Sequence, residues 1–147
     1  MPDPHHLVGI MAGIYHDGKY LMMIRGENES EGPGDLSFVS GKTELGPHRD
    51  NPLEETVHRE TMEEVGITVT DLVYVRSHAF TLSRGPNLLL AEFLCRWDSG
   101  TAHPADPEEV ESVAWMTPEE VENHPKSPSW TIATLAAMEA KRIELGR

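Results

Sequence analysis

GKTELGPHRDNPLEETVHRETMEEVGI, residues 41–67, is the most informative stretch of this chain. If the segment is helical, Glu60, Glu63 and Glu64 stand at positions i, i+3 and i+4 and project from one face. Carboxylates this close repel one another, so a helix gains nothing from them unless a cation lies between them. Hard cations such as Mg²⁺ take carboxylate oxygens and keep part of their water shell for phosphate substrates. The triplet therefore predicts a metal site.

A helix over residues 52–65 accounts for this pattern. Asn51 is a favourable N-cap residue, whose side-chain oxygen can accept a backbone N–H, and Gly66 provides the C-terminal stop. The apolar stripe expected to face the core consists of Leu53, Val57, Thr61 and Val65. At about 100° per residue, Glu60 and Glu64 lie beside that stripe, so we expect their carboxylates to face a cleft.

The same segment resembles the signature of the Nudix hydrolases, G-x5-E-x7-R-E-U-x-E-E-x-G-U, where U is a bulky aliphatic residue. The second half of the signature matches at Arg59, Glu60, Glu63, Glu64, Gly66 and Ile67. Thr61 stands where the signature has a bulky aliphatic residue. In the first half Gly41 matches, Ser40 replaces a common first glycine, and four extra residues, 47–50, precede Asn51 at the usual glutamate position.

This resemblance implies an α/β fold, the Nudix-type α/β/α sandwich with a mixed β-sheet between helices. It also implies that Glu60, Glu63 and Glu64 are ligands of Mg²⁺, with Mn²⁺ as an alternative ion. The carbonyl of Gly41 is expected to join them, because only glycine permits such close backbone approach.

The resemblance implies three catalytic residues, Arg59, Glu60 and Glu63. Arg59 is expected to orient a neighbouring glutamate through bidentate hydrogen bonds, and Glu60 is a candidate general base. Two loop acids remain open as additional groups. Glu44 could join the metal network, and Asp50 could replace the carboxylate that is missing at the signature's first glutamate position.

Phosphate and base contacts are expected outside the glutamate triplet. Arg25, at the end of a strand, and Lys42, beside Gly41, are the predicted substrate-binding cations. Trp130 and Phe80 could stack on a nucleobase, although buried packing is the favoured interpretation of both rings. In this family a further acid often comes from the loop before the penultimate strand. The candidates here are Glu108, Glu109 and Glu111, with the first two preferred.

Apolar patterning predicts the remaining strands and a terminal helix. Residues 6–15 and 19–24 flank Asp17-Gly18, a strong hairpin signal, and residues 26–35 form a long polar loop. Further strands are expected at residues 36–40, 67–80, 87–97 and 110–116. The terminal helix is expected at residues 129–145. Its expected apolar side consists of Ile132, Leu135, Ala136, Ala140 and Ile143.

Length and charge limit the class of protein. We expect residues 1–147 to form one domain with its own core. The net charge of −13 argues against binding long nucleic acids, whereas a small anion can still bind if metal ions supply positive charge. The single Cys95, the lack of a secretory signal and the lack of an apolar stretch of ~20 residues favour a cytoplasmic protein without a membrane partner. A homodimer is left open.

These observations favour a metal-dependent hydrolase that cleaves a phosphoanhydride bond in a nucleoside diphosphate linked to another moiety. The enzymatic alternative is a nucleoside triphosphate pyrophosphohydrolase, including one that removes oxidised nucleotides. A third hypothesis is a Nudix-like nucleotide-binding module without turnover, which Asn51 and the insertion at residues 47–50 favour. The intact glutamate triplet argues against that module, because loss of catalysis would first relieve the repulsion between these charges.

Overall fold

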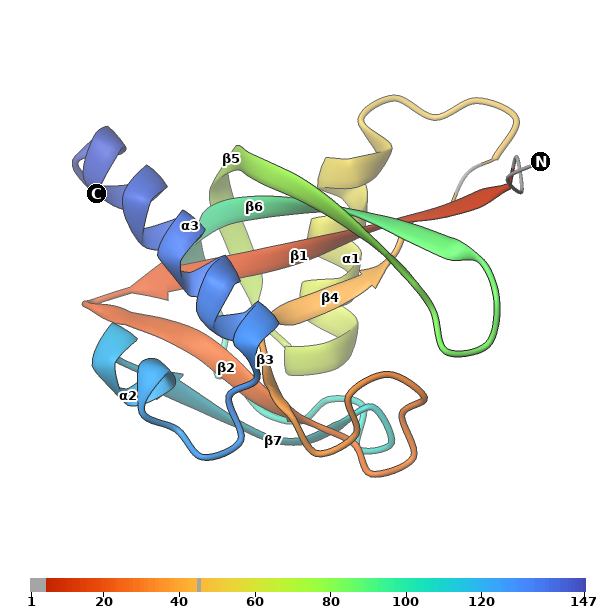
Figure 1. Ribbon diagram of the computed structural model, residues 1–147. Helices are drawn as coiled ribbons and strands as arrows, with labels where there is room; N and C mark the ends of the chain where they lie inside the picture. The colour runs from red at the N-terminus through yellow and green to blue at the C-terminus, as the bar shows by residue number, and fades with distance from the viewer. Residues whose placement is uncertain (1–4, 45) are drawn as a thin grey trace.

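The computed structural model describes residues 5–44 and 46–147 and arranges the strands in one sheet (Figure 1). The elements in chain order are β1 (His6–His16), β2 (Lys19–Arg25), β3 (Leu36–Ser37), β4 (Val39–Lys42), α1 (Pro52–Val65), β5 (Thr68–Thr81), β6 (Asn87–Ser99), β7 (Val110–Met116), α2 (Pro118–Glu122) and α3 (Ser129–Leu145). Each predicted element is present, and the strand expected at residues 36–40 is divided into β3 and β4. The expectation that the chain carries no secretory signal rests partly on residues 1–4, which lie outside the described residues.

The sheet is mixed because β1 runs parallel to β6 while the other paired strands are antiparallel. The strand order is β3-β2-β1-β6-β5, with β4 also beside β1 and β7 also beside β2. β1 divides one of its edges between two partners. Residues 9–12 pair with β4, and residues 15–16 pair with β2. β2 therefore diverges from β1 and carries β3 and β7 with it.

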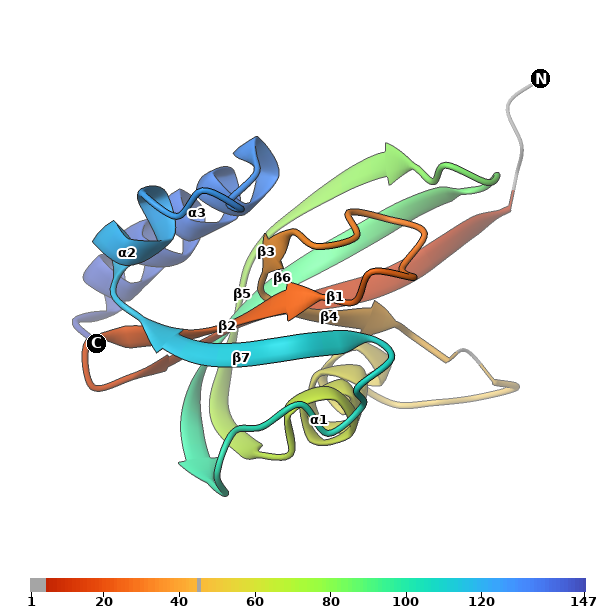
Figure 2. The same ribbon diagram turned by 90° about the horizontal axis from the view of Figure 1, so that it is seen from below.

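Helices cover both faces of this sheet, as Figures 1 and 2 show. α1 lies on one side, whereas α2 and α3 lie on the other. Alternate residues of β1 enter two separate cores, since Ile10 packs in the core that contains Val57 of α1 and Met11 packs in the core that contains Leu135 of α3. This arrangement confirms the predicted α/β/α sandwich. The described residues contain no helix with the length and apolar character needed to cross a membrane.

Of two predictions made from local sequence signals, the hairpin at Asp17-Gly18 is confirmed and the side-chain cap by Asn51 is not. Asp17 and Gly18 both have positive φ, 53° and 82°, as a two-residue hairpin of this type requires. The predicted side-chain cap of α1 is wrong. Asn51 occupies the N-cap position in the left-handed conformation, with φ 50°, and makes no side-chain capping hydrogen bond. Asparagine tolerates this conformation better than most residues, so Asn51 redirects the chain from the insertion into the helix.

The predicted apolar side of α3 is confirmed at Leu135 but wrong at Ala136, Ala140 and Ile143, which are exposed. The residues buried against the sheet are Thr131, Thr134, Leu135 and Met138, whereas Ile143 is 68% exposed. Threonine can occupy this face because each hydroxyl has an acceptor. Thr131 Oγ1 donates to the carbonyl of Leu36 at 2.8 Å, and Thr134 Oγ1 donates to a carboxylate at 2.9 Å. Hydrophobic periodicity cannot anticipate hydroxyl groups that are satisfied by distant partners.

Two helices end at a glycine in the left-handed conformation, and the pair provides a matched test. Gly66 after α1 has φ 71° and Gly146 after α3 has φ 70°. A Cβ on Gly66 would lie 2.3 Å from Cε1 of His103, whereas a Cβ on Gly146 meets nothing within 4 Å.

We expect Gly146→Ala to lower the free energy of unfolding by about 1 kcal/mol, the scale of the left-handed penalty for alanine. Gly66→Ala should lower it by more, because the imidazole of His103 must also move. Chemical denaturation of both variants measures the difference. Equal losses would show that the contact between Gly66 and His103 has no energetic effect.

Candidate active site

Three carboxylates meet where α1 faces the loop before β7. Oxygens of Glu60, Glu64 and Glu109 all lie within 4.8 Å of one another. Glu60 and Glu64 are one helical turn apart on α1, and Glu109 immediately precedes β7. The structure therefore brings together two members of the predicted triplet and one of the three acids proposed from the later loop. Glu63 lies outside this cluster, and its side chain is 60% exposed.

Backbone hydrogen bonds place Glu109 in the cluster. The N–H of Ala105 donates to the carbonyl of Glu64 at 3.0 Å, and the N–H of Gly26 donates to the carbonyl of Glu109 at 2.8 Å. The last carbonyls of a helix have no partner within the helix, so the loop before β7 satisfies two of them, those of Glu64 and Val65, as it docks on α1. Sequence alone left Glu108 and Glu109 equivalent because this docking depends on residues far apart in the chain.

Burial makes Glu64, at the centre of the cluster, strongly unfavourable for negative charge. Glu64 is buried, and its Oε2 has no hydrogen-bond partner among the described residues. This burial, aided by the nearby charges of Glu60 and Glu109, raises the pKa of Glu64 to about 9. Burial is also the main cause of the raised pKa values of Glu60 and Glu109. A buried carboxylate without a donor needs either a proton or a cation, and an all-oxygen donor set fits Mg²⁺ or Mn²⁺.

Gly41 allows β4 to lie directly against Glu60. A Cβ on Gly41 would come within 2.2 Å of Cδ of Glu60, so a larger residue would have to displace the side chain of Glu60. Arg59 supports the same contact from the helix. Its Nη2 donates to the carbonyl of Lys42 at 2.8 Å and to Oε1 of Glu60 at 3.0 Å. Arg59 thus divides its donors between a carbonyl and a carboxylate instead of making two bonds to one glutamate.

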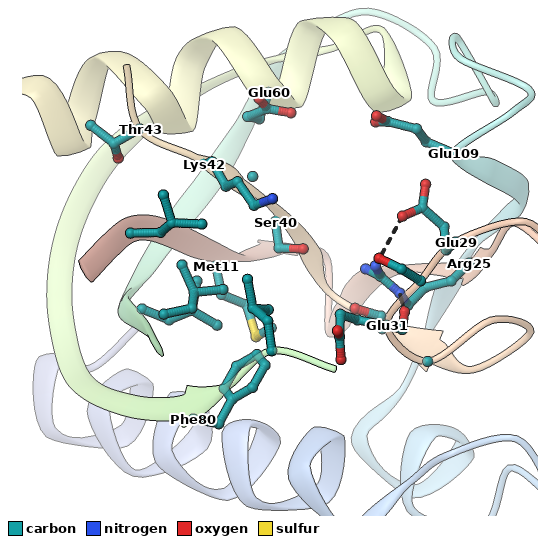
Figure 3. Close-up of a pocket in the computed structure, with 18 of the residues that line it drawn as sticks. Met11, Arg25, Glu29, Glu31, Ser40, Lys42, Thr43, Glu60, Phe80 and Glu109 are labelled. Atoms are coloured by element: carbon teal, nitrogen blue, oxygen red, sulfur yellow. Dashed lines mark hydrogen bonds and ion pairs between the residues drawn. The ribbon is translucent and has the colours of Figure 1, made fainter. Parts of the chain in front are cut away.

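The cluster opens into a cavity of about 990 Å³ that both predicted cations line (Figure 3). Arg25 Nε donates to the carbonyl of Glu31 at 2.7 Å, and its Nη2 lies 3.4 Å from a carboxylate oxygen of Glu29. The 26–35 loop therefore fixes the position of Arg25. Lys42 is exposed at the end of β4. Arg25, Lys42 and the acidic cluster therefore line the same cavity.

The 26–35 loop also contacts the turn between β5 and β6. Oε1 of Glu31 accepts hydrogen bonds from the N–H of Ser83 at 2.7 Å and from its hydroxyl at 2.6 Å. These bonds to Ser83 lower the pKa of Glu31. Because Glu31 lines the cavity, the contact ties two loops together along its wall.

The other side of the cavity is lined mainly by apolar groups. In Figure 3, Glu60 and Glu109 lie beside α1, whereas Met11 and Phe80 lie on the side towards α3. Phe80 is 39% exposed, Trp130 is 51% exposed, and both line the cavity. The preference for buried packing of these two rings is therefore wrong. Phe80 lies near the end of β5 and Trp130 near the start of α3, and these element ends border the cavity.

The other loop acids named from the sequence lie outside the cluster. Glu44 is 67% exposed, with its Oε1 3.7 Å from Nη1 of Arg59. Asp50 is 85% exposed and lies 3.3 Å from Nε2 of His48. Residues 47–50 contribute nothing to the described lining of the cavity. The insertion therefore lengthens the loop before α1 without supplying a carboxylate to the site.

Comparison with known protein families matches residues 5–137 to the NUDIX domain. The chain belongs to the Nudix family. The match extends far beyond the glutamate-rich segment and confirms the resemblance that this segment carries. It also agrees with the position of Glu60 and Glu64, two members of the acidic cluster, on α1, the helix that contains most of the second half of the Nudix signature.

A curated relative, the NAD-capped RNA hydrolase NudC of Chromobacterium violaceum, is 33% identical over 106 residues, which cover 72% of this chain and 36% of that protein. The chain thus spans about a third of the length of the curated relatives it matches. A solved MutT NUDIX hydrolase from Burkholderia pseudomallei matches with a TM-score of 0.75 and 22% identity over 90% of this chain and 98% of that chain.

The NUDIX domain of Shewanella oneidensis NrtR, solved in complex with ADP ribose, matches with a TM-score of 0.69 and 20% identity over 97% of this chain and 93% of that chain. The two solved structures show the shared fold. Together with the name of the curated relative, the family match supports the expected enzyme class, a Nudix pyrophosphohydrolase.

The raised pKa of Glu64 predicts how stability depends on pH and metal. In the metal-free protein Glu64 holds its proton up to about pH 9, whereas its reference pKa is 4.5. The native state therefore binds more protons than the unfolded state between these values, so this contribution to stability falls as pH rises. We expect the melting temperature in EDTA to fall between pH 5 and 9 more steeply for the native protein than for Glu64→Gln.

Millimolar Mg²⁺ should raise the melting temperature, and more at pH 8.5 than at pH 6, because the cation competes with the proton for these carboxylates. Differential scanning fluorimetry at low salt measures both effects. Parallel pH curves for the native protein and Glu64→Gln, with no response to Mg²⁺, would contradict a cation site in this cluster.

Proposed function

We propose that this chain is a Mg²⁺-dependent hydrolase that cleaves a phosphoanhydride bond in a nucleoside diphosphate linked to another moiety. The observation that carries the proposal is the cluster of Glu60, Glu64 and Glu109, in which one buried carboxylate oxygen has no hydrogen-bond donor. The cluster opens on a cavity that Arg25 and Lys42 also line. A chain with a net charge of −13 can bind a diphosphate only where positive groups gather locally.

The metal would be held by Glu60, Glu64 and Glu109, with the carbonyl of Gly41 as a further oxygen donor. When bound, such an ion neutralises the diphosphate and polarises the reacting water or phosphorus centre. Arg59 keeps the carboxylate of Glu60 oriented through its 3.0 Å hydrogen bond. The protein thus supplies a rigid set of oxygens from a helix, a strand and a loop.

The other side chains of the cavity bind the substrate and move the proton. Arg25 and Lys42 would contact non-bridging phosphate oxygens and stabilise the charge of the departing phosphate. Water attacks one phosphorus, and the anhydride P–O bond breaks with its electron pair remaining on the leaving oxygen. The proton of the attacking water passes to a carboxylate. Glu60, in the cluster, and Glu63, exposed beside Arg59, are the two candidates for that role.

The comparisons favour a small substrate that contains a nucleoside diphosphate. The curated relative is named for action on NAD-capped RNA, and NAD joins two nucleosides through a diphosphate. The NrtR domain was solved with ADP ribose, which contains the same linkage. The acidity of this chain disfavours a long RNA, so the proposed substrate is the small diphosphate compound. The cavity volume of about 990 Å³ leaves room for a substrate with two parts.

A substrate panel tests this proposal directly. NAD, ADP-ribose and the nucleoside triphosphates, including 8-oxo-dGTP, are incubated with Mg²⁺, and products are separated by ion-exchange chromatography. We expect NAD or ADP-ribose to be split between its two phosphates and EDTA to abolish the reaction. Preferential release of pyrophosphate from triphosphates would favour the alternative pyrophosphohydrolase. Binding without products from any nucleotide would favour the binding module.

Glu109 and its neighbour Glu108 form a matched pair for the proposed cluster. Glu109→Gln should lower kcat by at least ~100-fold, the scale observed when one key electrostatic group is lost from an active site. Glu64→Gln should have a similar effect. Glu108→Gln should leave kcat within ~3-fold, because Glu108 lies outside the cluster. Steady-state kinetics at saturating Mg²⁺ measures all three variants, and equal effects for Glu108 and Glu109 would contradict the proposed ligand set.

A further inference from the structure

A second carboxylate is buried away from the acidic cluster, on the α3 face of the sheet. Glu92 of β6 is 0% exposed. Its Oε1 accepts a hydrogen bond from Arg76 Nε at 2.8 Å, and its Oε2 accepts one from the hydroxyl of Thr134 at 2.9 Å. A fully buried charge persists only when it is paired and hydrogen-bonded, and Glu92 meets both conditions.

His78 connects this buried carboxylate to the cavity. The Nδ1 atom of His78 is buried 3.1 Å from Oε2 of Glu92, and Nδ1 has no hydrogen-bond partner among the described residues. Two acceptors at this distance would repel each other, so we assign a proton to Nδ1. The ring is 28% exposed and lines the cavity. In the neutral ring Nε2 is then an acceptor on the side away from Glu92.

Aromatic groups surround this part of the cavity. The rings of His78 and Phe80 are nearly parallel, with an angle of 18° and centroids 6.1 Å apart. Trp130 lines the same cavity from α3, and Leu88 and Leu90 contribute apolar surface from β6. A flat ring can bury both faces among such groups, while a polar atom on its edge must find a partner. His78 offers that partner.

The distance from His78 to Lys42 suits a nucleotide. One row of paired residues crosses four strands, namely Lys42 on β4, Gly9 on β1, Leu90 on β6 and His78 on β5. Three strand spacings separate its ends, about 14 Å in total. Lys42, proposed to contact phosphate, and His78 therefore lie at opposite ends of a row that is comparable in length to a nucleoside diphosphate.

We propose that His78, positioned by the buried Glu92, determines specificity by accepting a hydrogen bond from an N–H donor on the substrate's nucleobase. The proposed ligand is an amino-substituted purine nucleotide, with its base near Phe80 and its phosphates towards Lys42. The inference rests on the proposed function for the identity of the phosphate end. Glu92 is a positioning residue in this account, because it contacts the imidazole and not the cavity.

Calorimetry with two pairs of monophosphates tests the proposal without requiring turnover. Within each pair the ligands differ in one amino group: AMP against purine riboside monophosphate, and GMP against IMP. In at least one pair we expect the native protein to bind the amino ligand ~10-fold more tightly, the scale of one hydrogen bond. No preference in either pair would overturn the proposal.

His78→Gln and His78→Asn provide a matched pair of variants. The side-chain amide of glutamine can reach the position of Nε2, whereas that of asparagine reaches only the position of Nδ1. The affinity ratio is the affinity for the amino ligand divided by that for the other ligand of the same pair. We expect His78→Gln to retain most of the native ratio and His78→Asn to reduce it to about one. A ratio that is unchanged in His78→Asn would overturn the proposal.

Glu92→Gln tests the positioning role, with the affinity ratio as readout. A merely structural defect would weaken both ligands of a pair equally, whereas loss of ring positioning lowers the ratio. Thr134→Val, which removes one hydrogen bond to Glu92, serves as the second variant if Glu92→Gln does not fold. A native ratio in a folded variant would overturn the role of Glu92.

Product analysis on the same variants separates the two hypotheses. If no nucleotide is hydrolysed but the ratio depends on His78, the proposed hydrolase fails and base recognition stands. If ADP-ribose is hydrolysed and the ratio is insensitive to His78, the hydrolase stands and base recognition fails.

Discussion

The enforced proximity of three carboxylates is the constraint on which the site depends. Glu64 is buried beside Glu60 and Glu109, and one of its oxygens receives no hydrogen bond from the described residues. Such an arrangement is stable only with a bound proton or a cation, so the fold couples its own stability to ion binding. Much of the surrounding structure holds these groups in place. Gly41 lets the strand approach, and Arg59 fixes one carboxylate.

The central strand β1 connects the two ends of the cavity. Its antiparallel pairing with β4 positions Gly41 beside α1, and its parallel pairing with β6 aligns it with Glu92. Successive side chains of β1 alternate between the α1 and α3 cores, so the strand separates the two helical layers while it spans the cavity. The same sheet therefore positions both the acidic cluster and the side of the cavity that Phe80 lines.

Local sequence signals predicted the secondary structure well where the cause was itself local. The hairpin at Asp17 and Gly18 needs two positive φ angles, and the end of α1 at Gly66 needs one, which these residues supply at little steric cost. The predictions that failed concerned what each residue contacts. The hydroxyl of Thr134 is satisfied by Glu92, a residue 42 positions away, so a threonine replaced an expected aliphatic residue at the buried face of α3.

The sequence by itself determined the Nudix family, the helix that carries Glu60 and Glu64, and the expectation of a cation between carboxylates. These conclusions need only the spacing of residues along one helix and the repulsion of like charges. Only the tertiary structure selected Glu109 from its neighbours, placed Glu63 outside the cluster and brought His78 to the cavity. Each of these outcomes depends on how a loop or a strand docks against a distant element, and that geometry is set by long-range hydrogen bonds and packing.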